Sequence, residues 1–173
     1  MVSINNGTSA DRFLADNGIY IYNVRTQKER VVVTAASMPG GKGFLGKMSL
    51  SFDATKVVFD FRETPKVGFR IWEVNVDGTG LRQVLSAPAD EAQKVARWGK
   101  PAWHTDDIHP CYLPDGKSMF SSTRCEHTVL CGGSAALVAP ALHRMDADGT
   151  NVEQLTKSPV SEFCPVVLDD GRV

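Results

Sequence analysis

Several features that define large protein classes are missing from this chain. No apolar run approaches the roughly 18 residues that a transmembrane helix needs, and residues 1–16 are polar, without a charged-then-apolar secretion signal. The 19 basic and 20 acidic residues nearly cancel, so the chain lacks a basic surplus for binding phosphate backbones. Four cysteines in 173 residues are too sparse to define a small disulfide framework. We therefore expect neither a nucleic-acid partner nor a membrane span, and the 42% hydrophobic, 23% charged composition indicates a folded globular domain.

The familiar catalytic signatures are also missing. The chain contains no Cys-x-x-Cys-His run for haem attachment, and the glycine-rich stretch around Lys42 lacks the full phosphate-loop pattern. Ser121 and Ser122 lack the flanking glycines of a hydrolase nucleophile. The sequence therefore identifies no catalytic residue, and it leaves open whether the protein is an enzyme.

What the chain does contain is a repeated hairpin. Residues 74–85 and 144–156 each read as a short alternating strand, an Asp-Gly-Thr turn and a second alternating strand. A hairpin that recurs along one chain indicates a repeat architecture. Because repeat units bury their faces on their neighbours, we expect this chain to be part of a larger array.

A second type of hairpin precedes each Asp-Gly-Thr hairpin. Residues 109–124 hold two strand-like runs around a Pro-Asp-Gly-Lys turn at 114–117, where proline presets one backbone angle and glycine accepts the positive one. An earlier copy spans 48–62, with Asp-Ala-Thr-Lys at its turn, and a later copy begins at Phe163. Two hairpins per unit make a four-stranded antiparallel meander, and such meanders in series are the blades of a β-propeller.

The predicted fold class is therefore all-β, a partial β-propeller of four-stranded antiparallel blades, with about two full blades plus partial ones. We expect a single partial domain over 1–173, made of an outer half-blade (18–33), two blades (47–85 and 108–156) and the start of the next blade (160–173). We also expect both ends to be cuts through a longer protein, so that a signal peptide would lie upstream.

Two insertions interrupt the regular spacing of the repeat. Residues 87–107 link the two full blades, and the helix formers at 89–97 predict a short helix there. Residues 125–140 separate the second and third strands of the later blade and are expected to form a surface loop. Loops on a rigid scaffold commonly carry function, so both insertions are candidate contact surfaces.

The repeat resembles that of a known family. The strings at 113–124 and 142–156 are similar to the TolB-type (WD40-like) propeller repeat, which residues 47–85 match more loosely. The strings at 107–116 and 164–172 further resemble the propeller of bacterial proteins related to the hydrazine synthase alpha subunit. In that family a propeller precedes a C-terminal region that carries c-type haem. The resemblance implies the architecture and a periplasmic or otherwise extracytoplasmic setting, but it transfers no catalytic residue.

A polar run at residues 103–111 leads into the innermost strand of the later blade. Such strand starts converge around the central channel of a propeller, which could bring together His104, Asp106, Asp107 and His109. Imidazole with carboxylate suits zinc or another transition metal, so these four residues form a candidate metal or ligand site. The alternative is a polar rim in which the carboxylates cap backbone amides. Beyond such a metal ion we expect no cofactor within this chain, since c-type haem would lie only in a downstream region.

The four cysteines allow several arrangements. Cys125 and Cys131 bracket one loop, and a disulfide between them is our first expectation. Cys111 and Cys164 lie at the starts of consecutive inner strands and form a second candidate pair. Cys125, His127 and Cys131 could instead be three zinc ligands, or the cysteines could be free, half-buried thiols.

Two sets of large side chains have simple structural roles. Arg62 and Arg124, at the ends of second strands, are expected to brace carboxylates or backbone carbonyls between blades, with an anionic ligand as the alternative. Trp72, Trp98 and Trp103 are expected to pack between blades.

Three functions remain open at this point. The first is a non-catalytic scaffold or binding region of a larger extracytoplasmic bacterial protein, in which the two insertions contact other blades, domains or protein subunits. The second is the propeller portion of a multihaem c-type redox enzyme similar to the hydrazine synthase alpha subunit. The third is the gating propeller of a prolyl-oligopeptidase-like serine peptidase. A downstream Cys-x-x-Cys-His run would favour the second, a downstream Gly-x-Ser-x-Gly run the third, and neither the first.

Overall fold

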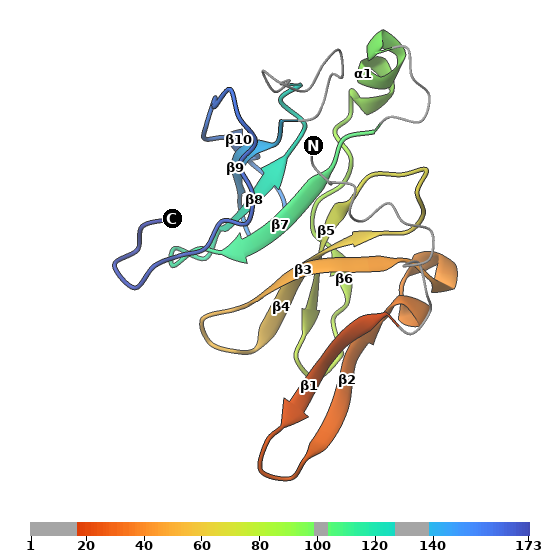
Figure 1. The fold of residues 1–173 in the computed structure, drawn as a ribbon, viewed down its shortest axis with the longest axis vertical. Helices are drawn as coiled ribbons and strands as arrows, with labels where there is room; N and C mark the ends of the chain where they lie inside the picture. Colours follow the sequence, from red (N-terminus) through yellow and green to blue (C-terminus); the bar gives the residue numbers. More distant parts are fainter. Residues whose placement is uncertain (1–16, 99–103, 127–138) are drawn as a thin grey trace.

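The strands of the chain form three antiparallel sheets that follow one another in sequence (Figure 1). The computed structural model describes residues 17–98, 104–126 and 139–173. The first sheet, here called the half-blade, pairs β1 (Gly18–Asn23) with β2 (Lys28–Thr34). Two short 3-10 turns, η3 (Ala35–Ser37) and η4 (Pro39–Gly41), connect it to the next sheet.

The other two sheets each have four strands in simple meander order. The first blade consists of β3 (Phe44–Leu50), β4 (Lys56–Arg62), β5 (Arg70–Asn75) and β6 (Arg82–Gln83). The second blade consists of β7 (Asp107–Tyr112), β8 (Ser118–Ser122), β9 (Ala141–Met145) and β10 (Glu153–Gln154). The prediction of four-stranded antiparallel blades is confirmed. None of the described helices is long and apolar enough to cross a membrane.

The two Asp-Gly-Thr turns make the same hydrogen bonds. In the first turn, the N–H of Asn75 donates to the carbonyl of Thr79 at 2.9 Å, and the N–H of Thr79 donates to Asp77 Oδ1 at 2.9 Å. In the second turn the matching bonds, around Asp148, measure 3.0 and 2.9 Å. In each turn the aspartate accepts a hydrogen bond from the backbone N–H two residues further on. This bond stabilises the turn through neighbouring residues alone, so the turn could be predicted from the sequence.

The glycines of these turns also set how closely neighbouring sheets approach. Gly78 and Gly149 have φ of +92° and +86°, a region that side chains rarely adopt. A Cβ on Gly149 would lie 1.9 Å from the carbonyl oxygen of Val84, and one on Gly78 would lie 3.0 Å from that of Val32. Each turn therefore packs against the outer end of the preceding sheet.

Each sheet buries its faces against its neighbours, and this produces three apolar clusters. One lies mainly between the half-blade and the first blade and includes Ile19, Val33 and Phe59. The next lies between the two blades and includes Val58, Ile71, Leu85, Phe120 and Met145. The third joins the second blade to the C-terminal segment (157–173) and includes Cys111, Met119 and, partly buried, Val167. Consecutive residues of β4 point to opposite faces, so this strand contributes to both of the first two clusters.

The insertion between the blades contains the predicted helix, as α1 (Glu91–Trp98). Lys94, which is buried, fixes α1 to the second blade by donating from Nζ to the carbonyl of Arg124 at 2.8 Å. The tip of the second insertion, 127–138, lies outside the described residues. In the C-terminal segment the later copy of the hairpin forms its turn, in which the N–H of Leu168 donates to the carbonyl of Arg172 at 2.8 Å.

We predict that Gly149→Ala destabilises the fold by about 1–3 kcal/mol, because it adds strain at positive φ to a clash with the neighbouring sheet. Gly116→Ala is the matched control, since Gly116 has a similar φ of +83° but nothing within 4 Å of an added Cβ. Urea unfolding followed by circular dichroism measures both. Equal losses in the two variants would contradict the proposed close contact between sheets.

Candidate functional site

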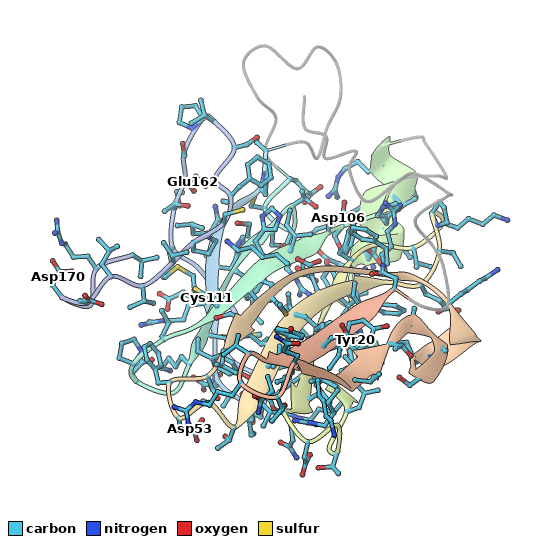
Figure 2. All side chains as sticks on the ribbon, turned by 60° about the horizontal axis from the view of Figure 1, so that its bottom comes forward. Tyr20, Asp53, Asp106, Cys111, Glu162 and Asp170 are labelled. Atoms are coloured by element: carbon cyan, nitrogen blue, oxygen red, sulfur yellow. The ribbon has the colours of Figure 1, made fainter. Side chains whose placement is uncertain are left out.

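The polar run 104–111 lies at the start of the inner strand β7, where the second blade meets the first blade. Figure 2 shows Asp106 at the end of the molecule near α1 and Cys111 further toward the C-terminal segment. The structure separates the predicted site residues into groups that have different partners. Two of these groups are held by different residues of β4, and the third pairs with Arg124 and Arg70.

His104 belongs to a group held by Arg62 of β4. Arg62 Nη2 lies 3.0 Å from His104 Nε2, and because a guanidinium has only donors, this imidazole nitrogen accepts. The imidazole is thus neutral with its proton on Nδ1, an atom that is buried and has no partner among the described residues. Burial, together with the charge of Arg62, lowers the pKa of His104 below its usual value. Asp106 lies 3.5 Å from Nε2 and accepts from the N–H of Phe69 at 2.9 Å.

Asp107, which is fully buried, belongs to a second group. Its two carboxylate oxygens accept from Arg124 Nε and Nη2, both at 2.7 Å, and Ser122 Oγ donates to Oδ1 at 2.7 Å. Arg70 of the first blade completes the group, with its Nη1 at 3.5 Å from Oδ2. A buried carboxylate is stable only when it is paired and hydrogen-bonded in this way. Asp107 therefore ties the two blades together.

Arg70 connects this group to α1. Its Nη2 donates to both carboxylate oxygens of Glu91 at 2.8 and 3.0 Å, and its Nη1 donates to the carbonyls of Phe69 and Thr105. The N–H of Thr105 also donates to Glu91 at 2.7 Å. Burial alone would raise the pKa of Glu91, but the bonds from Thr105 and the charge of Arg70 outweigh it and lower the pKa. The first turn of α1 is thereby fixed to both blades.

His109 belongs to a third group, at an irregular point in β7. The β7–β8 pairing shifts between Ile108 and Cys111, and His109 there has a φ of +55°. Its N–H donates to Asp60 Oδ2 at 2.7 Å, and its Nδ1 accepts from the N–H of Cys164 at 3.3 Å. Burial and the nearby charge of Lys47 lower the pKa of His109 to about 4. This imidazole is therefore neutral at neutral pH.

The four residues of the candidate metal or ligand site are thus divided between separate partners. His104 contacts Arg62, and Asp106 accepts from Phe69. Asp107 pairs with Arg124, and His109 bonds to Asp60. Within the residues that the structure describes, no group of three or more His, Cys, Asp or Glu side chains is arranged to hold a metal ion. Binding of a metal ion by this run stays a prediction.

The described cysteines, Cys111, Cys125 and Cys164, are free thiols. Cys111 is buried and Cys164 is exposed, so the second candidate disulfide pair is not formed in this structure. Cys125 Sγ lies 3.6 Å from the carbonyl of Ser122. Cys131 and His127 lie outside the described residues, so the first candidate pair and the alternative zinc site stay predictions.

Arg124 bonds between blades, as expected, because it also donates to the carbonyl of Ser86, whereas the carbonyls held by Arg62 lie within its own blade. Arg62 donates to the carbonyls of Thr64, Pro65 and Val67, and Arg124 holds Asp107. Their positions in the repeat differ by one residue, however. Arg62 follows the turn residue Lys56 by six positions, whereas Arg124 follows the equivalent Lys117 by seven.

Sequence reasoning missed Asp60 and Glu91. Asp60 is a lone carboxylate inside an apolar strand, and it is 2% exposed. Such an isolated charge in a buried run is a signal that could have been used. Glu91 lies in the first turn of α1, where an acidic residue is typical of any helix, so the sequence held no sign of its contact with Arg70.

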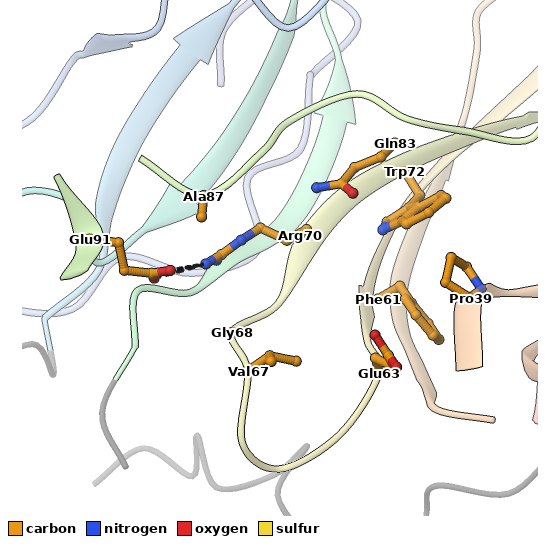
Figure 3. Close-up of a pocket in the computed structure, with 10 residues that line it drawn as sticks. All are labelled: Pro39, Phe61, Glu63, Val67, Gly68, Arg70, Trp72, Gln83, Ala87 and Glu91. Atoms are coloured by element: carbon orange, nitrogen blue, oxygen red, sulfur yellow. Dashed lines mark hydrogen bonds and ion pairs between the residues drawn. The ribbon is translucent and has the colours of Figure 1, made fainter. Parts of the chain in front are cut away.

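A cavity of about 300 Å³ lies beside this network, on the face of the first blade that is turned toward the half-blade (Figure 3). It is lined by side chains of mixed character: Pro39, Phe61, Glu63, Val67, Gly68, Arg70, Trp72, Gln83, Ala87 and Glu91. The Arg70–Glu91 ion pair forms one wall, and Phe61 with Trp72 forms the opposite one.

Comparison with known proteins shows the fold. No family model and no curated protein matches the chain. Among solved structures, TolB from Acinetobacter baumannii matches with 18% identity and a TM-score of 0.56, over 89% of this chain and 30% of that one. A putative TolB from Agrobacterium tumefaciens matches with 20% identity and a TM-score of 0.54, over 89% and 47%. Kuenenia stuttgartiensis hydrazine synthase matches with 17% identity and a TM-score of 0.61, over 89% and 23%.

These likenesses define the fold class. The chain has the fold of TolB-type β-propeller blades, as the repeat predicted. It spans less than half the length of each of these three structures, so it corresponds to a part of a propeller within larger proteins.

We predict that the stability of the fold depends on the protonation of Asp60. Burial raises its pKa from 3.8 to about 7, which means that the folded state binds this proton more tightly than the unfolded state. The stabilisation due to Asp60 is complete below about pH 4 and is lost as the pH rises through 7, whereas His109, with its pKa lowered to about 4, contributes in the opposite direction below about pH 6.5. The contribution of Asp60 is therefore obtained as the difference between the parent chain and a variant without its carboxyl group. Urea unfolding at a series of pH values measures it.

Across that window the free energy of unfolding of the parent chain should fall relative to that of Asp60→Asn, whereas its difference from Asp115→Asn, which changes an exposed turn carboxylate, should stay constant. A profile that keeps its slope in Asp60→Asn would show that the pH dependence arises elsewhere.

We also predict that Arg124→Gln costs about 3–5 kcal/mol of stability, because it leaves the carboxylate of Asp107 buried without its main partner. Arg144→Gln is the control. It removes an exposed pair with Glu153, for which we expect a loss below about 1 kcal/mol. Similar losses for the two variants in urea unfolding would argue against the bracing role of Arg124.

Proposed function

We propose that the chain is a non-catalytic binding and scaffolding region of a β-propeller in a larger extracytoplasmic bacterial protein. The observation that carries this proposal is the attachment of α1. Glu91 pairs with Arg70 of the first blade, and Lys94 bonds to the second blade, so the helix is attached to both blades. Its outward residues, Gln93 and Ala96, stay exposed. A rigid, exposed element loses little conformational entropy when a partner binds.

The partners proposed are other blades or domains of the same protein and separate protein subunits. Exposed apolar side chains lie along the half-blade and the inner strand β3, including Tyr22, Val31, Met48 and Leu50. Repeat units expose such faces where further units are meant to stack. The likeness to TolB structures supports the extracytoplasmic setting that the repeat resemblance implies.

A second candidate function is the propeller portion of a multihaem c-type redox enzyme. It is favoured by one observation, the TM-score of 0.61 with hydrazine synthase, which exceeds the values of 0.56 and 0.54 for the two TolB structures. In that case haem would be bound by another region of the protein, and the blades would position that region.

We predict that the α1 surface is a contact site. A photo-crosslinking residue placed at Gln93 or Ala96, in the protein expressed in its source bacterium, should give a discrete crosslink to a defined protein or domain, identified by mass spectrometry. The same residue at Lys28, which is exposed in the half-blade hairpin, is the control. Equal labelling from all three positions, or none from α1, would oppose the proposal.

The identity of the crosslinked species distinguishes the two functions. A haem-bearing region with Cys-x-x-Cys-His motifs would support the redox alternative. A partner without haem would support the binding scaffold. Recovery of the crosslinks in the cytosolic fraction alone would contradict the extracytoplasmic setting.

A further inference from the structure

We propose that the cavity beside α1 is a binding site for an organic cation, an alkylammonium or guanidinium group held by Glu63 and the aromatic pair Phe61–Trp72. This inference is independent of the scaffold function proposed above. It rests on the shape, the charge balance and the aromatic wall of one cavity.

The cavity has the size and composition of a small-ligand site. Its volume of about 300 Å³ suits a ligand of a few heavy atoms, and it mixes apolar walls with a few polar groups. In Figure 3, Glu63 lies next to Phe61 and Pro39, with Trp72 above them and Arg70 across the cavity. The carboxylate and the two aromatic rings therefore border the same space.

The charge balance of the lining favours a cation. Arg70 is already paired with Glu91 at 2.8 Å and lies 3.5 Å from Asp107. Glu63, by contrast, is half-buried and has no ion pair or hydrogen bond among the residues that the structure describes. A carboxylate that borders a cavity and has no partner of its own is available to pair with a bound cation.

The aromatic wall adds a second attraction for a cation. The rings of Phe61 and Trp72 pack edge to face, with centroids 6.0 Å apart and an interplanar angle of 83°. The negative face of an aromatic ring attracts ammonium and guanidinium groups, with tryptophan the strongest of the aromatic side chains. A carboxylate beside this aromatic pair therefore favours an organic cation over a neutral molecule.

Two glycines beside the cavity let neighbouring groups approach the backbone more closely than a side chain would permit. A Cβ on Gly40, which has a φ of +80°, would lie 2.6 Å from Glu63 Oε1. A Cβ on Gly68 would lie 1.8 Å from the carbonyl oxygen of Thr105 and 2.7 Å from Arg70 Nη1. Glycine at these two positions allows Glu63 and Arg70 to occupy opposite walls.

An anionic ligand fits this cavity poorly. Both terminal nitrogens of Arg70 are occupied, Nη1 by the carbonyls of Phe69 and Thr105 and Nη2 by the carboxylate of Glu91. The paired fork that usually binds carboxylate or phosphate is therefore not free. An anion would also face the carboxylates of Glu63 and Glu91.

The test is a titration of the full 173-residue chain with n-butylammonium chloride, followed by the indole N–H resonance of Trp72. That resonance is assigned as the one that disappears in Trp72→Phe. We expect a saturable shift in the millimolar range, and we expect Glu63→Gln to weaken binding about tenfold or more, equal to about 1.4 kcal/mol. Glu29→Gln, which removes an exposed carboxylate on β2, is the charge-matched control and should leave binding unchanged.

Two further probes separate the sources of the cation. Nα-acetyl-lysine N-methylamide presents the ammonium on a peptide backbone, so tighter binding than butylammonium would indicate the side chain of a protein partner. Tighter binding of butylammonium would indicate a free amine. Either result supports the cation site. Absence of a saturable shift with both probes, equal binding by Glu63→Gln, or preferential binding of sulfate would overturn it, provided that the unfolding curves of the variants match that of the parent chain.

Discussion

One buried carboxylate connects the inner strands of two consecutive blades. Asp60, in the second strand of the first blade, accepts a hydrogen bond from the N–H of His109 in β7 and another from the N–H of Lys47 in its own inner strand β3. Both donors lie where the pairing of an inner strand is irregular, which leaves those amides without ladder partners. By accepting from both, Asp60 of β4 joins the inner strands β3 and β7.

Apart from Asp60, the charged side chains between the blades mainly join strands and the helix to one another. Arg70, Glu91, Asp107 and Arg124 form a continuous set of ion pairs that links the first blade, α1 and the second blade. Buried charges of this kind must be mutually paired, so none of them is free to bind a ligand. Glu63 differs because no described residue neutralises it, and this difference distinguishes the proposed cation site from the surrounding brace.

The repeat could be predicted from the sequence because its turns are local. The carboxylate of Asp77 or Asp148 bonds to the backbone two residues on, and the following glycine takes the positive φ, so the chemistry lies within one short string. The candidate site could not be predicted in the same way. His104 and His109 are near each other in sequence, but an irregular pairing in β7 directs them to different partners, Arg62 and Asp60, on another strand.

By itself, the sequence determined the class of secondary structure, the four-stranded unit, the positions of the turns and the helix between the blades. Each of these depends on interactions among residues close together in the chain. The tertiary structure alone decided that Glu91 pairs with Arg70 and that Glu63 borders a cavity with Trp72. These contacts join residues from separate elements, and their geometry is set by how sheets stack and not by any local pattern.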